Sequence, residues 1–186
     1  MSPESDFDAW LTAAREGSAW ALAELYRSIY PRIVAYLRGV EPAHGDDVAS
    51  ETWLDIARGL VRFEGDERAF RAWALTIARR RVADLRRRRT RTRTDPAAPH
   101  DIAEAVAVGN VEDEAFASLG TDWAFDLITS SLPPNLAEVI LLNVVGDLGT
   151  AEVARILGRR PGTIRVMQHR ALRRLARTLE AQGVSR

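Results

Sequence analysis

The chain has 186 residues, no cysteine and a formal net charge of zero at pH 7. The lack of cysteine excludes disulfides and thiolate metal sites, and no apolar run is long enough to span a bilayer. The first ten residues are acidic and lack the basic and apolar regions of a signal peptide. A cytoplasmic protein without membrane insertion, made of one domain or two small ones, is therefore expected.

The neutral total hides a strong segregation of charge. Residues 1–94 hold 17 arginines and 14 acidic residues, residues 95–131 hold eight acidic residues and no arginine, and residues 132–186 hold nine arginines and four acidic residues. Two basic blocks joined by an acidic segment suggest a two-lobed DNA-binding protein with a connector. A genome rich in G and C explains why the chain uses arginine instead of lysine, but it does not explain the segregation.

Helical periodicity of apolar residues recurs along the chain and strand patterns are nearly absent, which predicts an all-α fold. In the first half, the predicted helices cover residues 6–16, 19–39, 46–60 and 67–89, with a polar loop at 63–66. Ser18 is the expected N-cap of the second helix, and Pro31 is expected to kink or break it.

The second half begins with a segment that has the composition of a flexible or weakly helical linker. Helices are predicted at residues 123–131 and 135–145, with Pro133 and Pro134 between them. We therefore expect two small helical domains, at residues 1–92 and 121–186, joined by an acidic linker at 93–120.

The most informative stretch is LGTAEVARILGRRPGTIRVMQHRALRRL, residues 148–175. It predicts a short helix at 150–157, a bend at Gly158 and a second helix that begins at Pro161. The second helix has an apolar stripe and many arginines; the stripe consists of Ile164, Ala171, Leu172 and Leu175. A short helix against a longer basic helix is the geometry that enters a DNA major groove, so the sequence favours a nucleic-acid function.

Two separated stretches resemble the extracytoplasmic-function (ECF) group of the bacterial sigma-70 family. Residues 45–89 contain DDVASETW followed by FRAWALTIARR and a basic run, which is similar to the second conserved region. Residues 132–175 contain LPPNLAEV, GDLGTAEVA, GTIR and HRA, which is similar to the fourth conserved region. The order and spacing of the two stretches also match those of the family.

The resemblance implies a subunit that binds core RNA polymerase, through the β′ clamp and the β flap, and directs it to promoters. It also implies regulation by a partner anti-sigma factor. The face expected to dock on the clamp lies on one side of a helix and consists of Asp47, Glu51, Asp55 and Arg58. A solvated charged face is the alternative interpretation of that pattern.

The resemblance assigns the −10 element to the N-terminal lobe and the −35 element to the C-terminal lobe. The candidate −10 residues are Phe63, Arg68, Arg71, Arg79, Arg80 and Arg87. The candidate −35 residues are Arg160, Thr163, Arg165, Val166, His169 and Arg170. Arg165 is the best candidate for base readout, because bidentate arginine to guanine is the commonest specific contact. Core packing is the expected role of Trp73.

The chain departs from the family pattern at several positions: Ser50, Arg80, Gly149, Arg159, Arg160 and Gln168. Gly149 takes the place of a serine cap, and Gln168 falls on the apolar stripe where leucine is usual. Because these changes gather in the reading element, no known −35 sequence can be transferred to this protein.

Two other function classes compete with this interpretation. A helix-turn-helix regulator that binds DNA without polymerase would explain residues 148–175 but not residues 45–89. An enzyme is not expected, because the sequence shows no phosphate-binding loop, nucleophile elbow or metal-ligand cluster, and hence no cofactor. The acidic linker is either a solvated tether or a mimic of nucleic-acid charge inside the polymerase channels.

Overall fold

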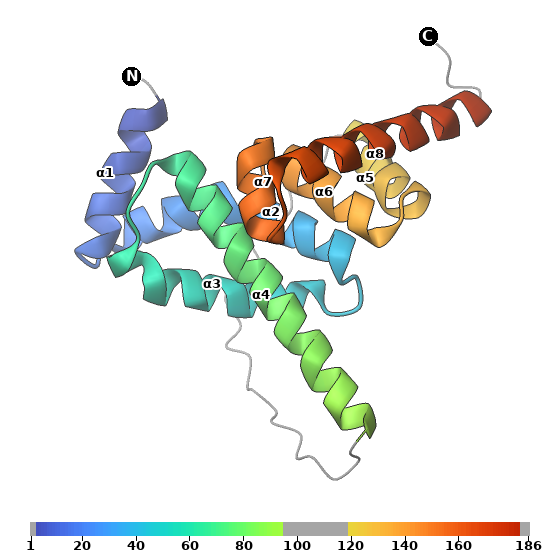
Figure 1. Cartoon of the computed structure of the whole chain (residues 1–186). Helices are drawn as coiled ribbons and strands as arrows, with labels where there is room; N and C mark the ends of the chain where they lie inside the picture. The colour runs from blue at the N-terminus through green and yellow to red at the C-terminus, as the bar shows by residue number, and fades with distance from the viewer. Residues whose placement is uncertain (1–2, 95–118, 183–186) are drawn as a thin grey trace.

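The structure is a computed structural model, and it describes residues 3–94 and 119–182. Within these ranges the chain forms eight α-helices and one short 3-10 helix, with no strand (Figure 1). The all-α prediction is confirmed for this part of the chain. The five acidic residues that motivated the two interpretations of the linker lie outside the described ranges: Asp101, Glu104, Glu112, Asp113 and Glu114.

The N-terminal lobe is built around the second helix. Its elements are α1 (Pro3–Arg15), α2 (Ala19–Val40), α3 (Gly45–Gly59), the 3-10 turn η1 (Leu60–Arg62) and α4 (Glu67–Thr94). Helix α2 packs against α1, α3 and α4. It presents Leu25, Ile29, Ile33 and Leu37 to the core, and all four side chains are fully buried. Burial of this apolar stripe is the main force that assembles the lobe.

Helix α2 continues through Pro31, so of the kink or break expected there, the break is wrong. Proline removes one backbone donor and costs the helix about 3 kcal/mol. Ile29 and Ile33, which flank Pro31, are buried and hold both halves of the helix in the same core. Ser18 is the N-cap residue as predicted, but its side chain makes no capping hydrogen bond.

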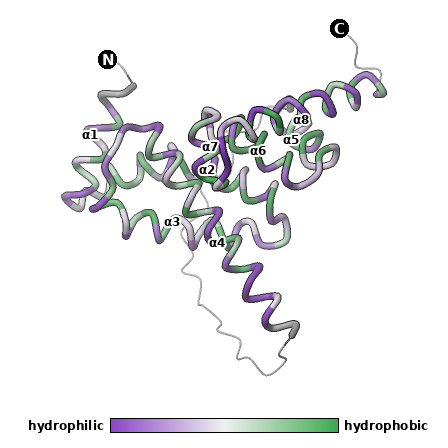
Figure 2. The backbone as a smooth tube through the Cα atoms, viewed as in Figure 1, coloured by the Kyte–Doolittle hydropathy of each residue, from purple (hydrophilic) through white to green (hydrophobic). Residues whose placement is uncertain are grey.

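Helix α4 is longer than the sequence predicted. It ends at Thr94 and therefore includes the first two residues of the expected linker. Its first half is packed in the lobe, whereas its second half extends away from the other helices and is strongly hydrophilic (Figures 1 and 2). The basic run thus projects as a helical arm.

The C-terminal lobe consists of α5 (Leu119–Ser131), α6 (Pro134–Val144), α7 (Thr150–Leu157) and α8 (Pro161–Ala181). Helix α6 is central and contacts the other three helices of the lobe. Its side chains Val139, Leu141 and Leu142 are fully buried. Helix α8 extends beyond the lobe toward the C-terminus (Figure 1).

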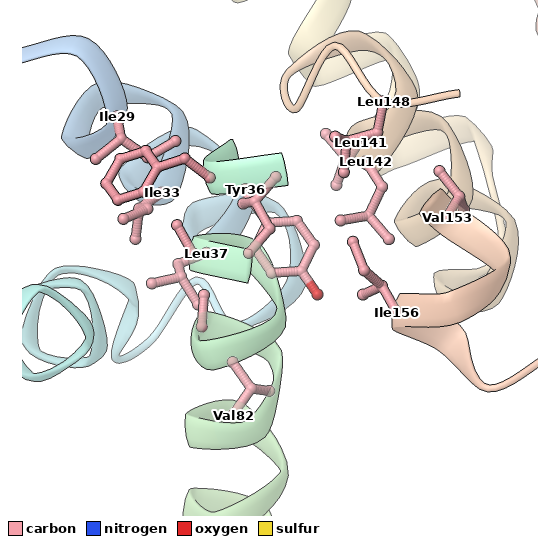
Figure 3. Close-up of a cluster of buried hydrophobic side chains, with 14 of the residues drawn as sticks. Ile29, Ile33, Tyr36, Leu37, Val82, Leu141, Leu142, Leu148, Val153 and Ile156 are labelled. Atoms are coloured by element: carbon pink, nitrogen blue, oxygen red, sulfur yellow. The ribbon is translucent and has the colours of Figure 1, made fainter. Parts of the chain in front are cut away.

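The two lobes pack directly on each other. Helix α2 lies against α6, and α4 lies against α7. Figure 3 shows Tyr36 of α2 between the apolar side chains of the N-terminal lobe and those of the C-terminal lobe, including Leu142 and Ile156. Only 1% of Tyr36 is exposed, and the apolar core runs without interruption from one lobe into the other.

Candidate nucleic-acid interface

Helices α7 and α8 form a helix-turn-helix whose turn follows from local chemistry. Gly158 ends α7 in the left-handed conformation, with φ 62°, and its backbone N–H bonds to the end of α7. Pro161 begins α8, where its missing N–H leaves no hydrogen bond unmade. The predicted bounds of α7 and the predicted start of α8 are both confirmed.

The buried face of α8 differs from the prediction at two residues, Met167 and Leu172. Ile164, Met167 and Ala171 face the core, whereas Leu172 is 58% exposed. Met167 takes the place expected for Leu172, because positions 164, 167 and 171 follow the three- and four-residue spacing of one helical face. Leu175 is partly buried and packs against the core as expected.

All six candidate −35 residues are exposed on the outer side of the reading helix. They are Arg160, Thr163, Arg165, Val166, His169 and Arg170. Val166 is half exposed. An exposed aliphatic group beside arginines fits the methyl group of thymine and the edge of guanine in a major groove.

Gln168 is explained by a small polar network behind the reading helix. Its Nε2 donates to Oδ1 of Asn143 over 2.6 Å, and its Oε1 accepts from the hydroxyl of Thr150 over 3.4 Å. Asn143 in turn donates to the carbonyl of Leu148 over 2.6 Å. The network joins α6, the α6–α7 turn, α7 and α8. Nothing in the sequence alone connected these three side chains.

The candidate polymerase-docking face on α3 is only partly free. Asp47 and Arg58 are exposed, whereas Glu51 and Asp55 are half-buried. Arg81 of α4 reaches both half-buried carboxylates, at 3.0 Å from Glu51 and 2.5 Å from Asp55. Arg81, which lies next to the candidate −10 residues Arg79 and Arg80, therefore fixes two of the docking acids.

The loop before α4 surrounds a buried aromatic ring. Phe63 is 7% exposed and its ring stacks on Trp73 with a centroid distance of 5.0 Å. Trp73 is half-buried and packs against the core, in agreement with its expected role. Gly65 has φ 141° and allows the loop to turn, and Asp66 caps α4 through the backbone N–H of Ala69 at 2.7 Å.

Because Phe63 is buried, its ring is not available to stack on a base in this conformation. The exposed residues of the loop are Glu64, Gly65 and Asp66. A shallow cavity opens beside the loop, and its lining includes Trp73 together with Glu152 and Arg155 of α7. One wall of this cavity thus belongs to the other lobe.

The candidate −10 arginines fall into two groups. Arg68, Arg71 and Arg79 each bind an acidic residue of the C-terminal lobe. Arg80 and Arg87 are exposed, and Arg87 pairs with Asp84 of its own helix. The sequence brought these arginines together on α4, but gave no indication that acids about 60 to 85 positions away would meet three of them.

Two more arginines of the basic run are bound at the base of the helical arm. Glu41 is 8% exposed and accepts from Arg86 at 2.9 Å and from Arg89 at 3.2 Å. Arg86 also donates to the carbonyl of Val40. A buried carboxylate is stable only when it is paired, so Glu41 and these arginines fix the direction of the arm.

Other kinds of site find little support in the described ranges. No group of three or more potential ligands is placed to hold a metal ion, so His44 and His169 lie without a cluster there. None of the helices described is both long enough and apolar enough to cross a membrane.

Comparison with known proteins covers both lobes. Residues 25–92 match the family described as Sigma-70 region 2, and residues 123–175 match Sigma-70, region 4. The chain is 34% identical to the ECF RNA polymerase sigma factor ShbA of Streptomyces griseus over 171 residues, covering 87% of this chain and 89% of ShbA. It is 32% identical to SigD, an ECF RNA polymerase sigma factor of Mycobacterium tuberculosis, covering 95% of this chain and 85% of SigD.

The fold is also found in solved structures. The sigma factor RpoE in complex with the anti-sigma factor NepR from Bartonella quintana has a TM-score of 0.60 and 22% identity, covering 88% of this chain and 98% of RpoE. The arrangement of helices is therefore shared well beyond the level of sequence similarity.

Proposed function

Because this chain belongs to the ECF sigma factors, the group of sigma-70-type subunits that direct RNA polymerase to promoters, we propose that its two lobes divide promoter recognition between them. The C-terminal lobe reads the −35 element with α8. The observation that supports this most directly is the placement of all six candidate residues on the exposed side of α8, opposite the buried Ile164 and Met167. Arg165 supplies base readout and the other five combine base and phosphate contacts.

The N-terminal lobe, in this proposal, binds the −10 element with the loop at 63–66 and the arginines of α4. Guanidinium groups on one helix neutralise phosphates and hold the strand, while the loop receives an unpaired base. Because Phe63 is buried, we assign capture of that base to the exposed residues of the loop and not to the Phe63 ring. The proposed domains remain residues 1–92 and 121–186, with the connector at 93–120.

The acidic face of α3 is the proposed docking surface for the β′ clamp. Asp47 is exposed and free to meet a basic partner, and Arg81 holds Glu51 and Asp55 in fixed positions. Prepositioned charges lose less conformational entropy on binding than mobile ones, which favours association with a complementary surface.

The proposal also covers the regulation of the protein and its location in the cell. RpoE was solved bound to an anti-sigma factor, and we propose a partner of that kind here, with the protein acting in the cytoplasm. We assign it no catalytic activity. The match to Sigma-70 region 2 covers the block that a stand-alone helix-turn-helix regulator has no reason to carry.

In vitro transcription with purified core polymerase and fragmented genomic DNA tests the proposal. Discrete start sites that require both proteins are expected, and the aligned upstream sequences would give the two promoter elements. Arg165→Ala should lower initiation at these sites, whereas Arg177→Ala, an exposed arginine near the far end of α8, should not. Tight, sequence-specific binding by the free protein without any new start sites would contradict it.

A further inference from the structure

Three ion pairs join the arginines of α4 to the C-terminal lobe. Arg68 lies 3.2 Å from Glu152, Arg71 lies 3.3 Å from Asp147 and Arg79 lies 3.0 Å from Glu138. The acids come from α7, the α6–α7 turn and α6, so each pair fixes a different part of that lobe. The arginines occupy one side of α4, at positions 68, 71 and 79, where the proposed function places the DNA backbone.

We call the contact surface between the two lobes, which includes these three ion pairs, the seam. Within it, Glu138 accepts two hydrogen bonds from the N-terminal lobe. Its Oε1 accepts both from Arg79 and from the hydroxyl of the buried Tyr36, each over 3.0 Å. A fifth interlobe contact, after the three ion pairs and the Tyr36 hydrogen bond, runs from Arg32 to the carbonyl of Val145 over 2.7 Å. The two lobes are therefore held together by ion pairs and directed hydrogen bonds in addition to apolar contacts.

Gly39 and Gly149 leave room for two of the contacts between the lobes. A Cβ atom on Gly149 would lie 2.5 Å from Nη2 of Arg68 and 2.8 Å from Oε2 of Glu152, so a side chain there would displace this ion pair. A Cβ atom on Gly39 of α2 would lie 2.5 Å from Cδ1 of Leu141 in α6. Gly149 is the position where the family pattern has a serine cap, so this departure creates room for the interlobe pair.

We propose that the C-terminal lobe competes with promoter DNA for the arginine face of the N-terminal lobe within the same chain. Glu138, Asp147 and Glu152 take the positions of phosphates, and α7 forms one wall of the cavity beside the −10 loop. The inference rests on the proposed function, because it needs Arg68, Arg71 and Arg79 to be DNA contacts. DNA and the C-terminal lobe then occupy one face in turn.

The seam also contains features that oppose its own closure. The Nε atom of Arg71 is buried and has no hydrogen-bond partner among the described residues. Arg32 is half-buried, and burial, followed by the nearby Arg71 guanidinium, lowers its pKa, while Asp147 and Glu67 act in the opposite direction. An unpaired buried donor and a desolvated guanidinium both disfavour the closed form, so a competing polyanion or polymerase has less to overcome.

The test separates the lobes without changing any charge. Gly149→Ser and Gly39→Ala each place a side chain in the seam, and each suits its own helix, since serine is a good N-cap and alanine is a better helix former than glycine. Gly162→Ala in α8 is the matched control, because a Cβ atom there meets nothing within 4 Å. The chain has no cysteine, so Ala9→Cys and Ala176→Cys, both exposed, provide two unique sites for fluorescent labels.

Two measurements on the full chain are needed. Energy transfer between the labels measures the separation of the lobes. Fluorescence anisotropy with a mixed-sequence single-stranded DNA of 20 nucleotides measures DNA affinity, and hence whether Arg68, Arg71 and Arg79 are free to bind phosphate. Apparent affinity scales with the fraction of open molecules, and loss of one surface ion pair changes that fraction by roughly two- to fivefold. We expect Gly149→Ser and Gly39→Ala to lower energy transfer and to tighten DNA binding by at least that factor, with Gly162→Ala unchanged.

If the variants lower energy transfer but bind DNA with unchanged affinity, the proposed competition is wrong. It is also wrong if energy transfer is unchanged in both variants. The proposed function is checked separately in the holoenzyme, where Arg79→Ala should weaken crosslinking to the −10 region. If that variant behaves like wild type there, the −10 assignment is wrong and the inference falls with it. If Arg79→Ala matters in the holoenzyme but opening does not help the free chain, only the competition is wrong.

Discussion

The side-chain amide of Gln168 donates to Oδ1 of Asn143 over 2.6 Å, and this contact links the reading helix α8 to the centre of its lobe. Gln168 is half-buried and sits on the side of α8 that faces away from the proposed DNA surface. The orientation of Arg165, less than one turn earlier on the same helix, therefore depends on a hydrogen bond made behind it.

Gln168→Leu is expected to destabilise the protein even though it restores the apolar residue typical of the family. The change removes the donor to Asn143 and the acceptor for Thr150, and a partly buried group left without its partner costs about 1–2 kcal/mol. Urea unfolding monitored by circular dichroism measures the loss. Gln182→Leu, the same chemical change at the exposed end of α8, is the control. Equal stability of the two variants would show that the network contributes nothing.

Arg165→Ala is expected to weaken −35 recognition in a base-specific way. Loss of one bidentate arginine–base contact costs about 1–3 kcal/mol of discrimination. Initiation should therefore fall at promoters with the intact −35 element, and the preference for one base pair of that element should disappear. Transcription from a panel of single-base −35 variants measures this. A uniform fall over the whole panel, with every preference kept, would assign Arg165 to phosphate instead.

Local chemistry explains which parts of the fold could be predicted. The turn between α7 and α8 was placed correctly, because Gly158 and Pro161 act on their own backbone and need no distant partner. The uninterrupted course of α2 through Pro31 could not be predicted, since it depends on burial of Ile29 and Ile33 against other helices. Tertiary packing overrode the local preference.

In the candidate site, too, features set by local sequence could be predicted and features set by tertiary packing could not. Exposure of the −35 residues follows from helical periodicity, which a sequence displays directly. The pairing of Arg68 with Glu152 does not, because the two residues are 84 positions apart and meet only when the lobes pack. Helical phase also favours Met167 over Leu172, because Met167 and not Leu172 continues the spacing of Ile164 and Ala171, and the structure buries Met167 and leaves Leu172 exposed.

Asp47→Asn is expected to weaken binding of core polymerase. Asp47 is the exposed acid of the proposed docking face, and a single rim charge acts mainly on association, typically by about two- to fivefold at low salt. Association rates measured with immobilised core polymerase at several salt concentrations should converge as ionic strength rises. Asp8→Asn on the exposed surface of α1 is the control. If both variants associate at the wild-type rate at low salt, α3 is not the docking face.

Alkaline pH is expected to destabilise the seam through Tyr36. Burial, together with the Glu138 carboxylate, raises the pKa of Tyr36 well above its ordinary value. The unfolded tyrosine ionises from about pH 10, whereas the folded one keeps its proton, so the unfolded state gains stability as pH rises. The stabilisation due to neutral Tyr36 is thus complete below about pH 10 and is lost as pH rises toward the folded pKa.

Tyr36→Phe separates this effect from others. The variant loses one hydrogen bond to Glu138, so it should be less stable by about 1 kcal/mol at pH 7, and its stability should fall less steeply between about pH 9 and 11. Thermal unfolding across that range gives both quantities. Tyr26, whose pKa is also raised, chiefly by burial, lies within the N-terminal lobe. Tyr26→Phe should therefore change the pH dependence of stability without changing the separation of the lobes. If Tyr36→Phe and wild type lose stability equally above pH 10, the hydroxyl of Tyr36 does not control the alkaline behaviour of the seam.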